Sequence, residues 1–256
     1  MMLSAILPHL PDTHVYFRSV PRKTPTVIAI PPLQQLQQAL EQCWKAGFDS
    51  EGARHYRNKI VGKTSKIGAV EVASVMAYWG MDSSVVQFIK CRASRALLPK
   101  FVKSYFSKKL GKEACPFCSL SPMRSEACAE ELLQFASAAE DLQLESDCRC
   151  PLLPLYLQWE GHSVTIVGIE TKPGEEAQLL VFDPLKEGSR LRETLAREKT
   201  LKVLRLPFKR LLETDIQIVL PSMRGLSTGE QNARRNQVNA VTAANEAVMQ
   251  AISGGR

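Results

Sequence analysis

The sequence predicts an α+β fold in which helices come first and an antiparallel sheet follows. Apolar residues recur at helical spacing in residues 33–46 and 69–78. Two β-rich runs come much later, Val164–Ile169 and Ala177–Phe182, and the segment Lys172–Glu175 between them has the composition of a turn. Because helices and strands are segregated along the chain, the pattern favours α+β over alternating βαβ units.

The helical part is marked by apolar stripes and by residues that begin or end helices. We expect a helix at Leu33–Ala46, because Pro31-Pro32 precedes it, its apolar residues share one face and Gly47 supplies a C-cap. The other helices expected are Met1–Leu7, Glu51–Lys59, Ala69–Tyr78, Pro99–Leu110 and Glu126–Leu144.

The sheet is expected from short runs rich in β-branched and aromatic residues. These runs are Val27–Ile30, Val85–Ile89, Leu152–Leu157, Val164–Ile169, Ala177–Phe182 and Ile216–Leu220. After Pro221 the composition becomes polar and alanine-rich, which predicts a final helix at Ser227–Ile252. We therefore expect one domain over residues 1–222, incomplete at its N-terminus, and a C-terminal helical tail over residues 223–256.

The composition of the chain indicates its cellular compartment and the kind of partner that it binds. The chain has 256 residues, 45% of them hydrophobic, and a formal net charge of +7, which suits one substantial core and an acidic partner. The basic segment Arg92–Lys112 is most simply a solvated face, with nucleic-acid contact as the alternative. Seven cysteines cannot all pair within the chain, and we expect neither a secretory signal nor a membrane span. These features predict a monomer in a reducing compartment, the cytoplasm or the nucleus.

A histidine and an aspartate stand at the two ends of the expected hairpin. If Ile169 and Glu170 lead into the turn and Ala177 leaves it, the numbers of paired residues add to about 345 or 347. His162 and Asp183 then lie on the same face, opposite or diagonal, ~5–8 Å apart at Cβ. A slip by one residue would put them on opposite faces. A carboxylate beside an imidazole can fix its tautomer and stabilise the imidazolium, as a hydrolase requires.

Several short segments in a fixed order carry a resemblance to a known family. They are Trp44–Asp49 with Gly52, Gly62 with Ile67–Glu71, Pro154–Gln158, Gly161–Ser163, Thr165–Glu170, Leu180–Pro184 and Gly225–Arg235. With these segments the chain resembles the papain-like cysteine peptidases that cleave ubiquitin and the ubiquitin-fold modifier, and most closely their zinc-finger-containing, ubiquitin-directed branch.

The resemblance implies a papain-like fold and a role for each matching residue. His162 corresponds to the general base, Asp183 to the aspartate that orients it and Gln158 to a supporting residue beside the oxyanion. Peptidases specific for the ubiquitin-fold modifier carry Asp-Pro-His, whereas here Leu185 follows Asp183-Pro184, so ubiquitin or polyubiquitin is the expected partner. No organic cofactor is implied.

Two positions depart from the family pattern. The family's nucleophilic cysteine lies in a Gly-Trp-Gly-Cys-Gly-Tyr-Arg segment before an apolar run that Met1–Leu7 matches, so we expect it shortly before Met1. Without that thiolate the chain as written would be nearly inert. The loop before Ile67 ends in tryptophan in the family and in Lys66 here.

The cysteines of the chain offer no clear substitute for the nucleophile. Cys43 falls on the apolar stripe of its helix and is expected to be a core residue. Cys91 follows an expected strand and precedes Arg92, and it is the weaker alternative for the nucleophile. Cys115-x-x-Cys118 is half of a zinc site, which Cys128, Cys148 and Cys150 would have to complete; reduced thiols without metal are the simpler interpretation.

Three functions therefore stay open at this point. The first is a deubiquitinase whose nucleophile is missing from this chain. The second is a pseudopeptidase that binds ubiquitin without cleaving it. The third is a zinc-stabilised, nucleic-acid-associated adaptor.

Overall fold

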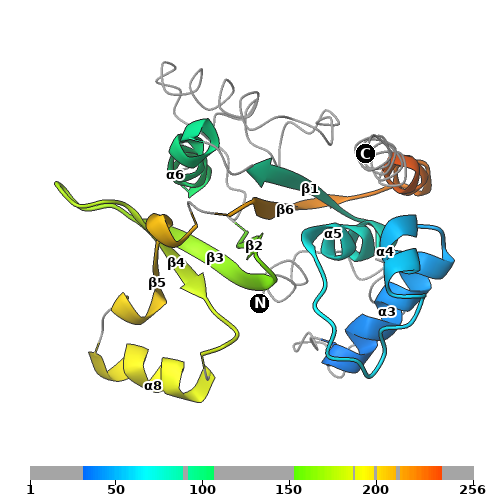
Figure 1. Cartoon of the computed structure of the whole chain (residues 1–256), viewed down its shortest axis with the longest axis horizontal. Coiled ribbons are helices and arrows are strands. Elements are labelled where there is room, and N and C mark those ends of the chain that lie inside the picture. Colours follow the sequence, from blue (N-terminus) through cyan, green and yellow to red (C-terminus); the bar gives the residue numbers. More distant parts are fainter. Residues whose placement is uncertain are drawn as a thin grey trace, which may run out of the picture. The chain divides into compact units, whose positions relative to one another are not determined.

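The computed structural model describes residues 31–88, 92–106, 153–186, 188–198, 201–211 and 214–237 (Figure 1). The expected segments at Met1–Leu7, Val27–Ile30 and Glu126–Leu144 lie outside these residues. Within the described part, helices precede a sheet with antiparallel pairing, so the α+β class is confirmed. No helix in the described ranges is long and apolar enough to span a membrane.

The sheet has six strands in the order β1-β6-β2-β3-β4-β5. Their bounds are β1 Met81–Phe88, β2 Leu155–Trp159, β3 His162–Glu170, β4 Gln178–Phe182, β5 Arg205–Pro207 and β6 Ile216–Gly225. The pairs β2–β3, β2–β6, β3–β4 and β4–β5 are antiparallel. The hairpin of β2 and β3, which carries His162, therefore lies in the middle of the sheet.

One face of the sheet carries the main core. Alternate strand residues such as Leu157, Val164 and Val181 are buried there, as the period of a half-buried strand requires. Helix α6, Arg92–Phe106, packs its residues Leu98, Phe101, Val102 and Tyr105 into the same cluster. The Tyr105 hydroxyl donates a hydrogen bond to the Leu153 carbonyl at 2.9 Å, which ties the helix to the segment before β2.

Several elements differ from the sequence-based expectation. Helix α6 begins at Arg92, so Pro99 lies inside the helix and not in its first turn. Strand β1 begins at Met81 because Gly80, with a φ of 76°, turns the chain directly out of the preceding helix. The structure also contains elements that the sequence did not suggest: α8 Gly188–Glu198, strand β5 and the short 3₁₀ helices η2 Lys202–Leu204 and η3 Phe208–Arg210.

The chain divides into two compact units. One comprises residues 1–5 and 84–221 and contains most of the sheet; the other comprises residues 6–83 and 222–256. The second unit contains helices α3 Leu33–Lys45, α4 Ser50–His55 and α5 Ala69–Tyr78. The expected domain over residues 1–222 and tail over residues 223–256 stay a prediction.

Residues after Ser222 are built into the helical unit. Ser227 and Glu230 form a reciprocal capping box in front of a helix over residues 228–237. Arg234 in that helix pairs with the buried Asp82 at 2.8 Å, and the Leu226 amide donates to the Gly80 carbonyl. Breaking such a buried pair from one side costs about 3–5 kcal/mol, so this contact fastens the C-terminal helix.

The buried Asp49 explains why Trp44, Asp49 and Gly52 occur together in one segment of the sequence. Asp49 is 2% exposed and caps α4 in the left-handed conformation, with one carboxylate oxygen accepting from the Gly52 amide at 3.0 Å. Its other oxygen accepts from the Trp44 indole at 3.1 Å. A Cβ on Gly52 would lie 2.1 Å from that carboxylate, so only glycine fits at this position.

The Gly52→Ala variant should therefore lose ~1–3 kcal/mol of unfolding free energy, because the added methyl displaces the Asp49 carboxylate from its buried partners. Urea unfolding followed by circular dichroism measures the loss. The control is Gly229→Ala, in the C-terminal helix of the same unit, where an added Cβ meets nothing within 4 Å. Equal stability of Gly52→Ala and the native chain would contradict this account of the cap.

Two side chains of α3 hold the loop that leads to α5. Glu41 accepts hydrogen bonds from the amides of Ile60 and Val61 at 2.8 and 2.9 Å. Gln37 accepts from the Gly62 amide and donates to the Lys63 carbonyl. The backbone hydrogen bonds from Val61 and Ile60 lower the pKa of Glu41, because they favour its ionised form.

The contribution of Glu41 to stability should depend on pH. Its pKa is lower in the folded than in the unfolded chain, so its stabilisation is complete above the unfolded value of about 4.3. This stabilisation is lost as the pH falls through the folded value. The stability difference between the native chain and Glu41→Gln should shrink over that interval in urea unfolding. Glu51→Gln, at an exposed position of α4, is the control; a difference that stays constant with pH would contradict the prediction.

Candidate active site

The tip of the β2–β3 hairpin places an aromatic ring opposite the candidate histidine. Glu160 and Gly161 form a two-residue turn, with φ values of 40° and 72°. Two positive φ angles are what a type I′ turn needs, and this turn matches the twist of the strands it joins. Trp159 and His162 flank the turn and are direct cross-strand partners, so their side chains lie on the same face of the sheet.

The register between β3 and β4 changes along the hairpin. Near its turn the pairs are Glu170–Gln178, Ile169–Leu179 and Gly168–Leu180, so the register expected from the sequence is wrong there. Beyond a bulge the pairs are Ile166–Val181 and Thr165–Phe182, which is one of the expected registers. Val167 is the extra residue on β3, and the bulge restores the register before the strands reach the candidate site.

The bulge decides on which face Asp183 lies. Continued beyond Phe182, the observed register sets Asp183 opposite Val164, on the face that His162 shares and diagonal to it. If Val167 were paired opposite Val181 in a regular ladder, Asp183 would stand opposite Thr165 and point to the other face. The expectation that His162 and Asp183 share a face therefore holds, for a reason that the sequence did not reveal.

The side chains of His162 and Asp183 are in contact. The Nε2 atom of His162 lies 3.2 Å from the Oδ1 atom of Asp183, and the side chains are 27% and 22% exposed. Because Nε2 faces a carboxylate, the proton of a neutral imidazole belongs on Nε2. The lone pair of Nδ1 is then left to accept a proton from another group, which is the arrangement a general base requires.

Local backbone structure fixes the carboxylate. Asp183 begins a β-turn in which Pro184 holds the second position and the Lys186 amide donates to the Asp183 carbonyl at 3.0 Å. The Leu185 amide donates to Asp183 Oδ1 at 2.9 Å, so the oxygen that faces His162 is also held by the backbone. The aspartate therefore meets the histidine with little freedom to rotate.

Gln158 is not brought to this pair. It is the cross-strand partner of Ser163 on β3 and of Gln217 on β6, so strand alternation places it on the opposite face from Trp159 and His162. Its Oε1 atom is buried and accepts no hydrogen bond from the described residues. The supporting role that the family resemblance implies for Gln158 stays a prediction.

The cysteines are placed only in part. Cys43 is fully buried in the cluster with Phe48, Ala77 and Leu226, and burial, reinforced by the Asp49 carboxylate, raises the pKa of its thiol. It is thus a core residue and no nucleophile. The other six lie outside the described residues: Cys91, Cys115, Cys118, Cys128, Cys148 and Cys150. Over the described ranges, no group of three or more His, Cys, Asp or Glu side chains is arranged to hold a metal ion.

A protein-family comparison covers both residues of the pair. The model of peptidase family C78 matches residues 1–214 of the chain. The chain belongs to this family. The C78 match includes the hairpin that carries His162 and Asp183.

Curated relatives of this C78 chain are long proteins. It is 26% identical to the mouse zinc finger-containing ubiquitin peptidase 1 over 220 residues, and 27% identical to the human protein over the same length. These matches cover 84% of this chain and 32% of each relative, so the chain spans about a third of their length. Among solved structures, UfSP from C. elegans matches 77% of this chain and 26% of that one at 14% identity, with a TM-score of 0.39.

Deleting Val167 should remove the bulge and keep the candidate pair together. Ile166 would then adjoin Gly168, so the Gly168–Leu180 and Ile166–Val181 pairs would follow one another in one regular register, and Asp183 would stay on the face of His162. Nuclear Overhauser contacts between backbone protons should report Ile166 opposite Val181 in the deletion variant. Val167→Ala keeps the extra residue and should keep both the native pairs and the bulge. A deletion variant in which Ile166 lies opposite Phe182 would show that Val167 is not the extra residue of the bulge.

Proposed function

We propose that this chain supplies the general base and the orienting carboxylate of a ubiquitin-directed cysteine peptidase that cleaves isopeptide bonds in polyubiquitin. The observation that carries the proposal is the contact between His162 Nε2 and an Asp183 oxygen that the Leu185 amide also holds. A paired imidazole with a free Nδ1 is the part of a cysteine peptidase that a binding module does not need.

The chemistry follows from this arrangement. A cysteine thiol gives its proton to His162 Nδ1, and the thiolate sulfur attacks the isopeptide carbonyl. As the carbon–nitrogen bond breaks, the imidazolium returns the proton to the leaving lysine amine. This step leaves a thioester on the cysteine. A water molecule, deprotonated by the same nitrogen, attacks the thioester carbonyl; the carbon–sulfur bond breaks, the carboxylate product leaves, and the imidazolium returns its proton to the cysteine sulfur. Asp183 stabilises the imidazolium at each stage and keeps Nδ1 aimed at the reacting atoms.

Ubiquitin is favoured over the ubiquitin-fold modifier by the residue after the Asp-Pro pair. Leu185 occupies the place of the histidine in an Asp-Pro-His arrangement, and its side chain is 82% exposed. His162 on the β2–β3 hairpin is therefore the imidazole that faces Asp183. The relatives named for ubiquitin peptidase activity support the same substrate class.

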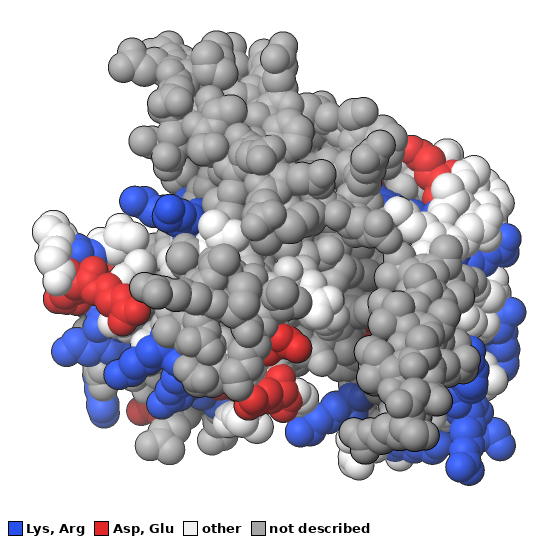
Figure 2. All heavy atoms as spheres, turned by 45° about the horizontal axis from the view of Figure 1, so that its top comes forward, with Lys and Arg blue, Asp and Glu red and all other residues white. Residues whose placement is uncertain are grey.

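Nucleic-acid binding finds less support. On the face drawn in Figure 2, the described Lys and Arg side chains form several separate groups, with Asp and Glu side chains among them. A phosphate backbone is bound best by a continuous basic stripe. The zinc-stabilised adaptor would rest on cysteines outside the described residues.

A ubiquitin probe with a C-terminal electrophile tests the proposal on the full-length native protein. We expect a covalent adduct on a cysteine, identified by peptide mass spectrometry. His162→Ala should slow adduct formation by about 10²–10⁴-fold, because it removes the proton acceptor. Asp183→Asn should also slow it, since the amide cannot stabilise the imidazolium. His55→Ala removes an exposed histidine of α4 and serves as the matched control.

Other outcomes would overturn the proposal. Ubiquitin binding without any adduct would make the protein a pseudopeptidase. Faster reaction with a probe built on the ubiquitin-fold modifier would assign the other substrate branch. An adduct on Cys91 would place the nucleophile within residues 1–256.

A further inference from the structure

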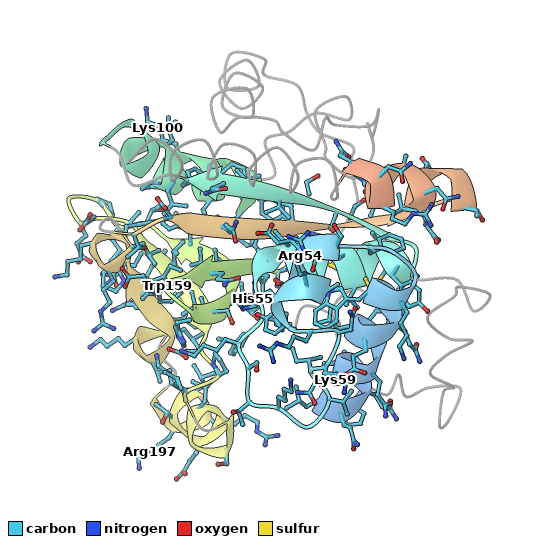
Figure 3. The ribbon with its side chains drawn as sticks, turned by 45° about the vertical axis from the view of Figure 1, so that its right-hand side comes forward. Arg54, His55, Lys59, Lys100, Trp159 and Arg197 are labelled. Carbon is cyan, nitrogen blue, oxygen red and sulfur yellow. The ribbon has the colours of Figure 1, made fainter. Side chains whose placement is uncertain are left out.

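Trp159 touches the candidate base but has no assigned role. Figure 3 labels it on the β2–β3 hairpin. The centroids of the Trp159 and His162 rings are 4.9 Å apart and the ring planes are inclined by 89°, an edge-to-face contact. Such contacts are favoured by the opposed charge distributions of ring face and ring edge.

Trp159 is also paired with β6, the strand on the other side of β2. Trp159 is paired with His162 on β3 and with Ile216 on β6, and Ile216 is 4% exposed. The partly buried Trp159 side chain packs against the main core cluster. Because the two-residue turn at Glu160-Gly161 fixes the pairing, the indole presents a rigid surface to the imidazole.

Two contacts are needed to fix the orientation of the His162 imidazole. A hydrogen bond to Asp183 favours the orientation in which Nε2 faces the carboxylate, but alone it leaves the ring free to turn away about χ2, and a ring that has turned away has no fixed tautomer. Rotation of a histidine about χ2 is broad, so a single partner restricts it weakly. The Trp159 ring, at right angles to the imidazole, restricts this rotation.

We propose that Trp159 is a positioning residue, which holds the His162 imidazole in the plane where Nε2 meets Asp183 and Nδ1 stays available for proton transfer. This inference rests on the proposed function.

The charged surroundings of His162 do not account for its orientation without the indole. Asp183 is the charged partner that the structure places in contact with it. Glu160 lies in the turn two residues earlier, and Asp215 precedes Ile216 at the start of β6. Neither carboxylate belongs to a strand residue paired with His162; among the described residues, its cross-strand partner on β2 is Trp159.

The test uses nitrogen NMR of the chain itself, labelled with ¹⁵N at histidine, so it does not depend on a nucleophile. At about pH 8.5, where a histidine side chain is ordinarily neutral, long-range ¹H–¹⁵N spectra report which ring nitrogen carries the proton. We expect a single His162 tautomer with the proton on Nε2. Trp159→Phe should keep it, whereas Trp159→Leu, which fills space without a ring, should give averaged nitrogen signals from both tautomers.

Tyr156→Leu is the matched control, because Tyr156 is an aromatic residue of the same strand on the opposite face. It should leave the His162 signals unchanged. A single Nε2–H tautomer in a folded Trp159→Leu variant would overturn the inference and make Trp159 a packing residue only. Averaged signals in the native chain would overturn it too. Failure of the ubiquitin probe alone would count against the proposed function and leave this orientation intact.

Discussion

One extra residue in β3 determines what the rest of the hairpin can do. In an antiparallel pair every residue is assigned to a face by its position in the register, and the faces alternate without exception. The bulge at Val167 shifts that assignment between the turn of the hairpin and its open end. The side chains near the turn can therefore pack in one register while His162 and Asp183 meet in another.

The candidate site is built from parts that are rigid for local reasons. A two-residue turn fixes Trp159 against His162, and a proline-containing turn fixes the carboxylate of Asp183. These constraints act over a few residues of backbone, and the buried face behind them supplies the hydrophobic free energy that holds the strands together. Orientation at the site thus depends on strand geometry more than on long-range contacts.

The sequence predicted the elements whose signals are local. Apolar stripes located α3 and α5 nearly to the residue, and the β-rich runs located the hairpin with its histidine and aspartate. It could not predict the bulge, because Val167 lies in the apolar run Ile166–Ile169, where no polar alternation marks the face of each residue. Helix α8 was missed for the opposite reason, since its polar composition gives no core-facing stripe strong enough to stand out.

Two further residues show what a single sequence leaves open. The pairing of Trp159 with His162 could have been predicted from the sequence, because the Glu160-Gly161 dipeptide between two strands is a hairpin signal. The side of the sheet taken by Gln158 follows from that same turn, which separates it from His162 by strand alternation. A family resemblance indicates which residue of this chain corresponds to a residue of the family. Only the strand register shows on which face of the sheet that side chain lies.

The return of the chain into the helical unit has a consequence for synthesis. Arg234 and Asp82 are 152 residues apart in sequence, and the sheet unit is inserted between them. At a translation rate of about 5–20 residues per second, the ribosome needs roughly 8–30 s to deliver the second partner after the first. During that time Asp82 has no counterion from the C-terminal helix. The sheet unit, whose segments have emerged by then, has the opportunity to fold first and bring the ends of the helical unit together.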